Sequence, residues 1–156
     1  MKKIILPIFV IGGIFSVQLA NAKVVKFDHS GVKVGSIVES CYHNPCSGAK
    51  VIGFKKLSSS PSSAMIELKL LGYSRDWDSK KKDWNKKSHK IFITCSIDHP
   101  TLTIDGQVTT LPLNSENAIP GVLYSDYTMY AATCHGRDNL DETRLAKKYG
   151  YDVQDW

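Results

Sequence analysis

Four cysteines and five histidines are the side chains of this 156-residue chain best suited to metal or redox chemistry. The candidate metal ligands are Cys41, His43, Cys46, Cys95, His99, Cys134 and His135. The spacing of Cys41 and Cys46 fits a structural zinc site, but Cys95 and Cys134 do not supply the second close pair that such a site needs. No C-x-x-C redox motif occurs in the sequence. We therefore expect neither a metal nor another cofactor.

The N-terminal residues indicate the compartment in which these cysteines fold. Lys2 and Lys3 precede an almost wholly apolar run at 4–17, and an Ala-Asn-Ala sequence ends at Ala22. This pattern is typical of a secretory signal peptide cleaved after Ala22, and the apolar run is too short to span a bilayer comfortably. The short basic start is typical of bacterial export. We expect a periplasmic or secreted protein with no transmembrane segment after processing.

Export predicts that the four cysteines form two disulfides. An Asn-Pro step between Cys41 and Cys46 can reverse the chain and bring their Cα atoms to about 5.5 Å. Cys95 lies on the apolar face of the strand-like run 90–97, so a bridge from it to Cys134 would cross the core. We predict the pairs Cys41–Cys46 and Cys95–Cys134, and the two crossed pairings stay open.

The segment 72–90 joins two strand-like runs and carries seven basic and three acidic residues, a net charge of +4. The residues that we expect to form a binding surface are Arg75, Trp77, Lys80, Lys81, Lys82, Trp84, Lys86 and Lys87. Tryptophan and arginine are enriched in interface hot spots, and lysines steer acidic partners. The alternative is a solvated charged linker whose tryptophans fold back onto the sheet edge.

The overall charge also favours an anionic partner. Loss of the two leader lysines lowers the net charge from +5 to about +3. We expect the partner to be an acidic protein or an anionic envelope component, such as a polymer or lipid head groups. We do not expect nucleic acid as the partner of an exported protein, although lysine with tryptophan can bind single strands.

A catalytic constellation is not visible in the sequence. Histidine follows aspartate or cysteine directly at 28–29, 98–99 and 134–135, but neighbours in a strand point to opposite faces of the sheet. No G-x-S-x-G, H-E-x-x-H or glycine-rich phosphate loop occurs. The expectation therefore leans away from an enzyme.

Apolar residues alternate with polar ones in most of the chain, which predicts half-buried strands. The strand-like runs are 24–38, 50–54, 65–71, 90–97 and 122–134. A hairpin is expected at 99–113, around Asp-Gly at 105–106. We prefer a turn with a glycine bulge, which places Leu102 opposite Val108, over a two-residue turn, which places Leu102 opposite Thr109.

The C-terminal segment 137–150 changes in character. It predicts either a short helix, capped by Asp138 or Asn139 and stopped at Gly150, or a frayed tail. The expected organisation is a signal peptide at 1–22, a β-rich domain at 23–136 and a helix or tail at 137–156. The fold class is mainly β: a small antiparallel sandwich or open barrel with a long basic hairpin loop and two disulfides.

These features together predict an exported, non-enzymatic binding protein. Its size and compartment suit an inhibitor or immunity protein that acts against a cell-envelope hydrolase or toxin, an analogy that rests on no motif. The first alternative is a binder of anionic envelope polymer or lipid head groups. The second alternative is a small periplasmic hydrolase, whose catalytic residues would meet only in space.

Overall fold

The computed structural model describes residues 25–136 and 140–154, so the expected signal peptide lies outside the described residues. The strands are β1 (Ile37–Ser40), β2 (Cys46–Ser59), β3 (Ser63–Arg75), β4 (Asp83–Trp84), β5 (His89–Ser96), β6 (Thr101–Ile104) and β7 (Gln107–Thr110). The helices are a 3₁₀ turn (Gly121–Leu123), α1 (Tyr124–Cys134) and α2 (Glu142–Tyr149). Within the described residues, no helix has the length and apolar character needed to cross a membrane.

The strands form one antiparallel sheet in the order β1-β2-β3-β5-β6-β7, and β4 pairs with β3 beside β5. Each strand on this path pairs with the next, so the sheet is a meander. Alternate residues of β3 are buried: Ala64, Ile66, Leu68 and Leu70. The mainly β, antiparallel class predicted from period-two alternation is therefore confirmed.

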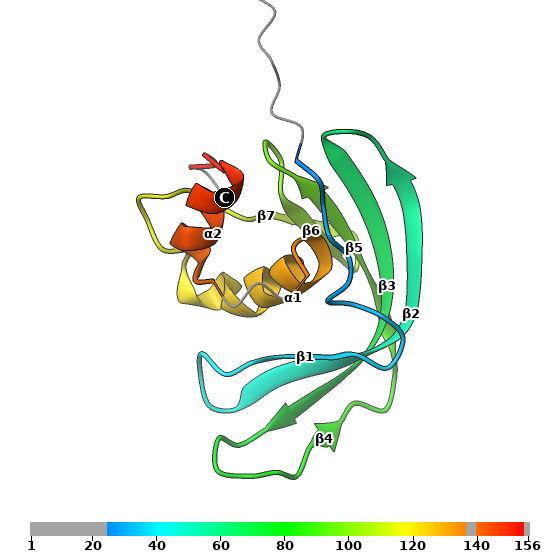
Figure 1. Ribbon diagram of the computed structural model, residues 1–156. Coiled ribbons are helices and arrows are strands. Elements are labelled where there is room, and N and C mark those ends of the chain that lie inside the picture. Colours follow the sequence, from blue (N-terminus) through cyan, green and yellow to red (C-terminus); the bar gives the residue numbers. More distant parts are fainter. Residues whose placement is uncertain (1–24, 137–139, 155–156) are drawn as a thin grey trace, which may run out of the picture.

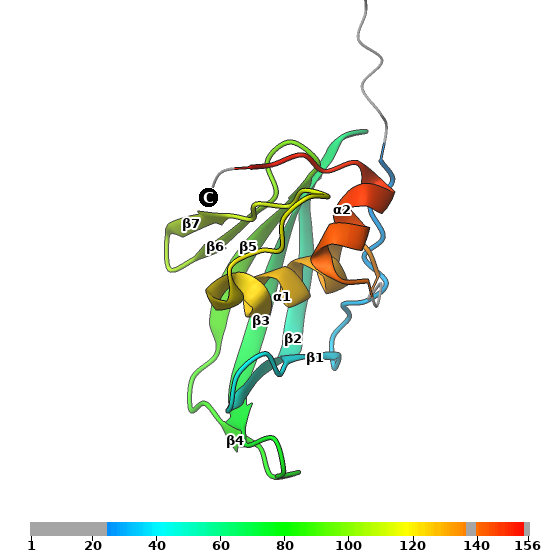
Figure 2. The ribbon, with the colours of Figure 1, turned by 90° about the vertical axis from the view of Figure 1, so that its left-hand side faces the viewer.

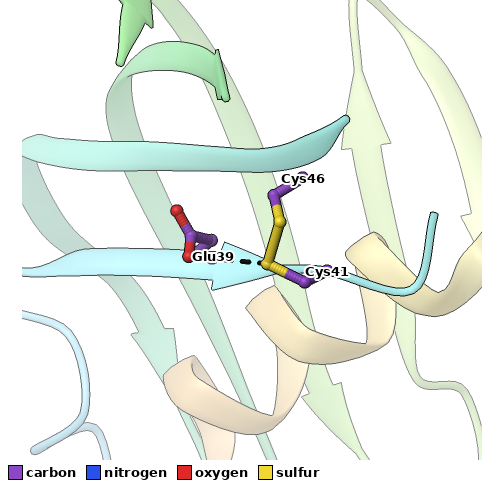
Figure 3. A group of neighbouring side chains, drawn as sticks. All are labelled: Glu39, Cys41 and Cys46. Atoms are coloured by element: carbon purple, nitrogen blue, oxygen red, sulfur yellow. Dashed lines mark hydrogen bonds between the residues drawn. A yellow bond between two sulfur atoms is a disulfide. The ribbon is translucent and has the colours of Figure 1, made fainter. Parts of the chain in front are cut away.

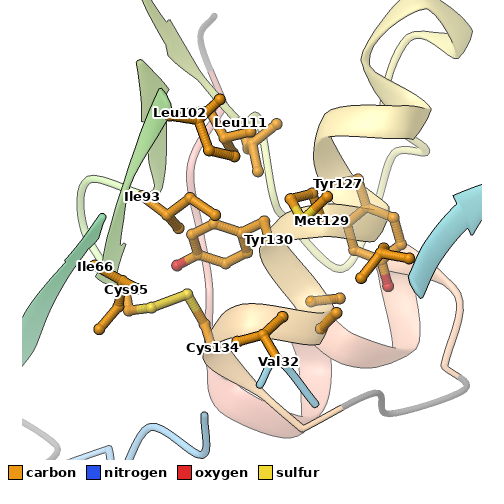
Figure 4. Close-up of a cluster of buried hydrophobic side chains, with 14 of the residues drawn as sticks. Val32, Ile66, Ile93, Cys95, Leu102, Leu111, Tyr127, Met129, Tyr130 and Cys134 are labelled. Carbon is orange, nitrogen blue, oxygen red and sulfur yellow. A yellow bond between two sulfur atoms is a disulfide. The ribbon is translucent and has the colours of Figure 1, made fainter. Parts of the chain in front are cut away.

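Both helices lie on the same face of the curved sheet, with α1 in the concavity and α2 beside it (Figures 1 and 2). Tyr130 of α1 packs among sheet residues such as Ile93 and Leu102 (Figure 4). The predicted Cys95–Cys134 disulfide runs through this core, joins β5 to the end of α1 and spans 5.5 Å between Cα atoms. The layer that packs against the sheet across the core is therefore formed by the two helices.

The prediction of a strand at 122–134 is wrong, because this segment forms the end of the 3₁₀ turn and α1. Its tyrosines and threonines favour strands, but its buried residues Leu123, Tyr127, Tyr130 and Cys134 recur at helical spacing. The C-terminal half of α1 is buried on all sides, which hides the apolar stripe that marks a surface helix.

The preferred register of the β6–β7 hairpin is also wrong. Leu102 pairs with Thr109, and Thr103 pairs with Val108, so the turn has two residues and no bulge. Asp105 and Gly106 have φ angles of 49° and 82°. Positive φ at both central positions matches the right-handed twist of the strands, and this outweighs the matching of apolar with apolar residues across the pair.

The C-terminal segment folds as a helix and not as a frayed tail. Its N-cap is Asp141, whose carboxylate accepts a 2.9 Å hydrogen bond from the Arg144 amide; the predicted caps Asp138 and Asn139 lie outside the described residues. Gly150 ends the helix at φ 82°, as predicted. Leu145 and Ala146 are fully buried in the core that also contains α1, so α2 is docked.

Candidate functional site: a basic knob on a disulfide-closed turn

The predicted Cys41–Cys46 disulfide closes a turn between β1 and β2, with Cα atoms 4.2 Å apart. The turn contains the cis Asn44–Pro45 peptide bond. Hydrogen bonds join this turn to the basic loop after β3. We call the turn 41–46 together with the loop 75–84 the knob; its loop occupies the end of the molecule that carries β4 (Figure 1).

Glu39 lies at the base of the knob and binds Arg75 in a bidentate ion pair. Arg75 Nη2 and Nε donate to the two carboxylate oxygens at 2.6 and 2.9 Å. Figure 3 shows that the carboxylate also approaches the disulfide, at 3.5 Å from Cys41 Sγ. Because a disulfide sulfur carries no proton, this approach is a contact and not a hydrogen bond donated by sulfur.

Tyr73 adds a third hydrogen bond to Glu39, at 2.6 Å from its hydroxyl. The bond crosses β2 at Gly48, which pairs with Glu39 on one side and with Tyr73 on the other. A Cβ at position 48 would lie 2.5 Å from Tyr73 Cζ, so only glycine leaves room for the ring there.

These contacts shift the titration of all three groups. Hydrogen bonding from Arg75 holds the pKa of Glu39 below its ordinary value, although partial burial opposes this. Hydrogen bonding to Glu39 raises the pKa of Arg75. Burial, followed by the bond to Glu39, raises the pKa of the Tyr73 hydroxyl. At neutral pH the cluster therefore holds one carboxylate, one guanidinium and one neutral phenol.

Arg75 also organises the loop that follows it. Its Nη1 lies 3.1 Å from the carbonyl oxygens of Asp76, Trp77 and Ser79, and its two N–H groups are shared among these three acceptors. Trp77 is fastened to the disulfide turn, since its indole N–H donates to the His43 carbonyl and its amide donates to Asn44 Oδ1, both at 3.1 Å.

The two tryptophans of the loop play different parts. Trp77 keeps 56% of its surface exposed although its backbone and indole N–H are both held. Trp84 is 38% exposed and packs against Tyr73, with ring centroids 4.7 Å apart. Lys82 covers the same Tyr73 ring, with Nζ 4.7 Å from the centroid. The alternative to a binding surface, in which the tryptophans fold back onto the sheet edge, thus describes Trp84 better than Trp77.

The remaining predicted binding residues are exposed cations of the same segment of chain: Lys80, Lys81, Lys86 and Lys87. Tyr42, which sequence reasoning did not single out, adds a second exposed ring from the disulfide turn. It stacks on Tyr124 at the start of α1, with centroids 4.8 Å apart. The knob therefore presents Trp77 and Tyr42 among lysines on a surface tied to the sheet and to α1.

Within the described residues, one group of side chains has the types and spacing of metal ligands: Glu39, Cys41 and Cys46. Its chemistry does not favour a metal. Both sulfurs are consumed by the disulfide, and the carboxylate already binds Arg75. Cys134 is likewise bridged, so Cys134 and His135 cannot act as a thiolate–imidazole pair. His135 is buried and its Nε2 lies 2.7 Å from the Tyr151 hydroxyl.

The sequence named Arg75, Trp77, Lys82 and Trp84 as binding residues, and the structure gathers them at one end of the sheet. Sequence reasoning missed the groups that hold them there: Glu39, Tyr73 and Gly48 come from three strands and carry no local motif.

Comparisons with protein-family models, curated proteins and solved structures find no match to this chain.

Proposed function

We propose that this protein is an exported binding protein that captures an acidic protein partner through the knob. The proposal rests on the state of Trp77. This residue stays more than half exposed, while two hydrogen bonds to the disulfide turn fix its position. An ordered, exposed indole loses little conformational freedom on binding, and this is the property of an interface hot spot.

The surrounding charge supports an acidic partner. Lys80 and Lys81 are exposed on the same loop as Trp77, but Asp76, Asp78 and Asp83 are exposed there too, and Arg75 is neutralised by Glu39. The excess of positive charge comes from the exposed Lys86 and Lys87, which directly follow the loop. Exposed lysines raise the rate of association with a negative surface more than they raise the affinity. An inhibitor or immunity protein that blocks an envelope hydrolase or toxin is the form of this function that we propose, in the periplasm or outside the cell. The two disulfides suit such an oxidising compartment.

The test begins with affinity capture on the processed protein from the envelope of the producing cell, followed by titration calorimetry with the purified partner. We expect a one-to-one complex that Trp77→Ala weakens by at least tenfold, which corresponds to about 1.4 kcal/mol. Val108→Ala is the matched control, because Val108 is 66% exposed and lies in the β6–β7 hairpin outside the knob. Equal affinity of the Trp77→Ala variant and the parent would contradict the proposal.

The second candidate, an anionic envelope polymer or lipid head group, is favoured by the exposed lysines alone. It predicts retention on envelope fractions that falls steeply with salt. It also predicts that Lys80→Glu/Lys81→Glu abolishes retention while Trp77→Ala leaves most of it. The two variants therefore distinguish the two partners by the order of their effects.

A further inference from the structure

A pocket of about 310 Å³ lies between the first turns of α1 and the concave face of the sheet. This volume falls at the lower end of the range of small-molecule sites. Its apolar lining comes from five strands and α1: Val38, Ala49, Leu70, Ile91, Leu102 and Met129. Trp77 and the lysines of the knob do not line it.

Hydroxyl groups line the same pocket. Ser40 is 93% buried, and within the described residues its Oγ makes no hydrogen bond. A buried hydroxyl without a partner destabilises a fold by about 1–3 kcal/mol, so it calls for an explanation. Ser47 and Ser125 bring two more hydroxyls, 2.8 Å apart, from β2 and α1.

A carboxylate lies in the same wall. Asp126 is in the first turn of α1, where the helix dipole favours negative charge. It takes part in none of the three ion pairs among the described residues. Burial is the one cause that raises its pKa, so no neighbouring cation compensates the loss of solvent.

We propose that this pocket binds a small organic cation, a primary ammonium on a short apolar body. The carboxylate of Asp126 and the hydroxyl of Ser125 accept two N–H groups of the ammonium, and the Ser40 hydroxyl accepts the third once its side chain turns toward the pocket. The body lies on the apolar lining. A primary ammonium has three donors and no acceptor, which complements this carboxylate and these hydroxyls; Asn85 and His89 complete the polar lining. The inference does not depend on the partner of the knob.

The test uses benzylammonium and benzyl alcohol, which share an aromatic body and differ in charge. Both are titrated into the ¹⁵N-labelled processed protein at 0.15 M salt, and amide shifts locate the site. We expect benzylammonium to shift the amides of Ser40 and Asp126 and to bind at least tenfold more tightly than the alcohol. Asp126→Asn is expected to abolish that preference, and Ser40→Ala to reduce the affinity severalfold.

Trp77→Ala is the control, because an exposed indole can also attract an ammonium ion. We expect this variant to bind benzylammonium as the parent does. The proposal fails if benzylammonium causes no shifts at millimolar concentration, if both probes bind equally, or if Trp77→Ala removes the binding. It also fails if Asp126→Asn keeps the preference. Asp126→Ala gives the same reading should the asparagine variant not fold, and amide spectra check the fold of each variant.

Discussion

At the residue scale, Glu39 is the group on which the geometry of the knob depends. It accepts hydrogen bonds from Arg75 and Tyr73, which lie two residues apart on β3 and therefore point to the same face of the sheet. The side chains of Glu39 and Arg75 are 24% and 20% exposed, so solvent screens their attraction less than that of a surface pair. Through Arg75 this carboxylate positions the loop that carries Trp77.

We predict that Glu39→Gln lowers the free energy of unfolding by about 1 kcal/mol and loosens the loop, because a neutral amide has one acceptor oxygen and cannot form the bidentate ion pair with the guanidinium. Acrylamide quenching of tryptophan fluorescence should increase in this variant. Glu67→Gln is the control, since Glu67 forms an isolated 3.0 Å pair with Lys90 on the sheet. Equal quenching in the two variants would show that Glu39 does not order the loop.

The same carboxylate predicts a pH dependence. The pKa of Glu39 lies below its ordinary value of 4.5. A carboxyl group with a lowered pKa stabilises the fold above its unfolded pKa, and this contribution disappears as the pH falls through the folded pKa. Quenching of the parent should therefore rise as the pH is lowered below 4.5, before global unfolding. A Glu39→Gln variant that shows the same rise would assign it to another group.

At the scale of elements, the two disulfides have separate tasks. Cys41–Cys46 closes a five-residue separation at the surface and fixes the turn that holds Trp77. Cys95–Cys134 spans 39 residues, and both of its sulfurs are buried between β5 and α1. The first bridge therefore serves the knob, whereas the second attaches the helical layer to the sheet.

Substitution of each pair of cysteines by serine should distinguish the roles of the two disulfides. On the chain-entropy description, loss of the long bridge lowers the free energy of unfolding by about 4 kcal/mol and loss of the short one by about 2 kcal/mol. We expect Cys41→Ser/Cys46→Ser to keep the fold and to weaken the binding that we propose for the knob, and Cys95→Ser/Cys134→Ser to be the less stable variant. Urea unfolding of both variants measures the order, and the reverse order would contradict it.

At the scale of the whole molecule, one hydrophobic core joins the sheet, α1 and α2. A buried chain of hydrogen bonds links the tail to the sheet: the Tyr151 hydroxyl lies 2.8 Å from that of Tyr130, which in turn bonds both backbone groups of Ser96. The C-terminal helix is thus part of the layer that fills the concave face of the sheet.

This continuity predicts a single unfolding transition in which α2 takes part. Leu145→Ala should lower the free energy of unfolding by about 3 kcal/mol, because it removes a fully buried side chain. Lys147→Ala, on the exposed side of α2, should change it by less than about 0.5 kcal/mol. Chemical denaturation followed by circular dichroism provides the measurement, and equal stability of the two variants would mean that α2 does not belong to the core.

The sequence by itself determined features that depend on near neighbours or on residue type. Period-two alternation identified β3 and β5, and the Asn-Pro step favoured the pair Cys41–Cys46. The sequence left the two crossed pairings open, and the structure confirms Cys41–Cys46 and Cys95–Cys134. Glycine at 150 marked the end of α2 because few other residues adopt a positive φ.

Only the tertiary structure decided the features that depend on what surrounds a segment. The helical period of residues 122–134 was hidden in the sequence because the C-terminal half of α1 is buried on all sides and has no polar face. Glu39 meets Tyr73 across Gly48, and Ser40 and Asp126 line the same pocket, because strand register and helix docking bring distant positions together. Contacts between residues far apart in the sequence leave no local pattern in the chain, because they depend on how the strands and helices pack in space.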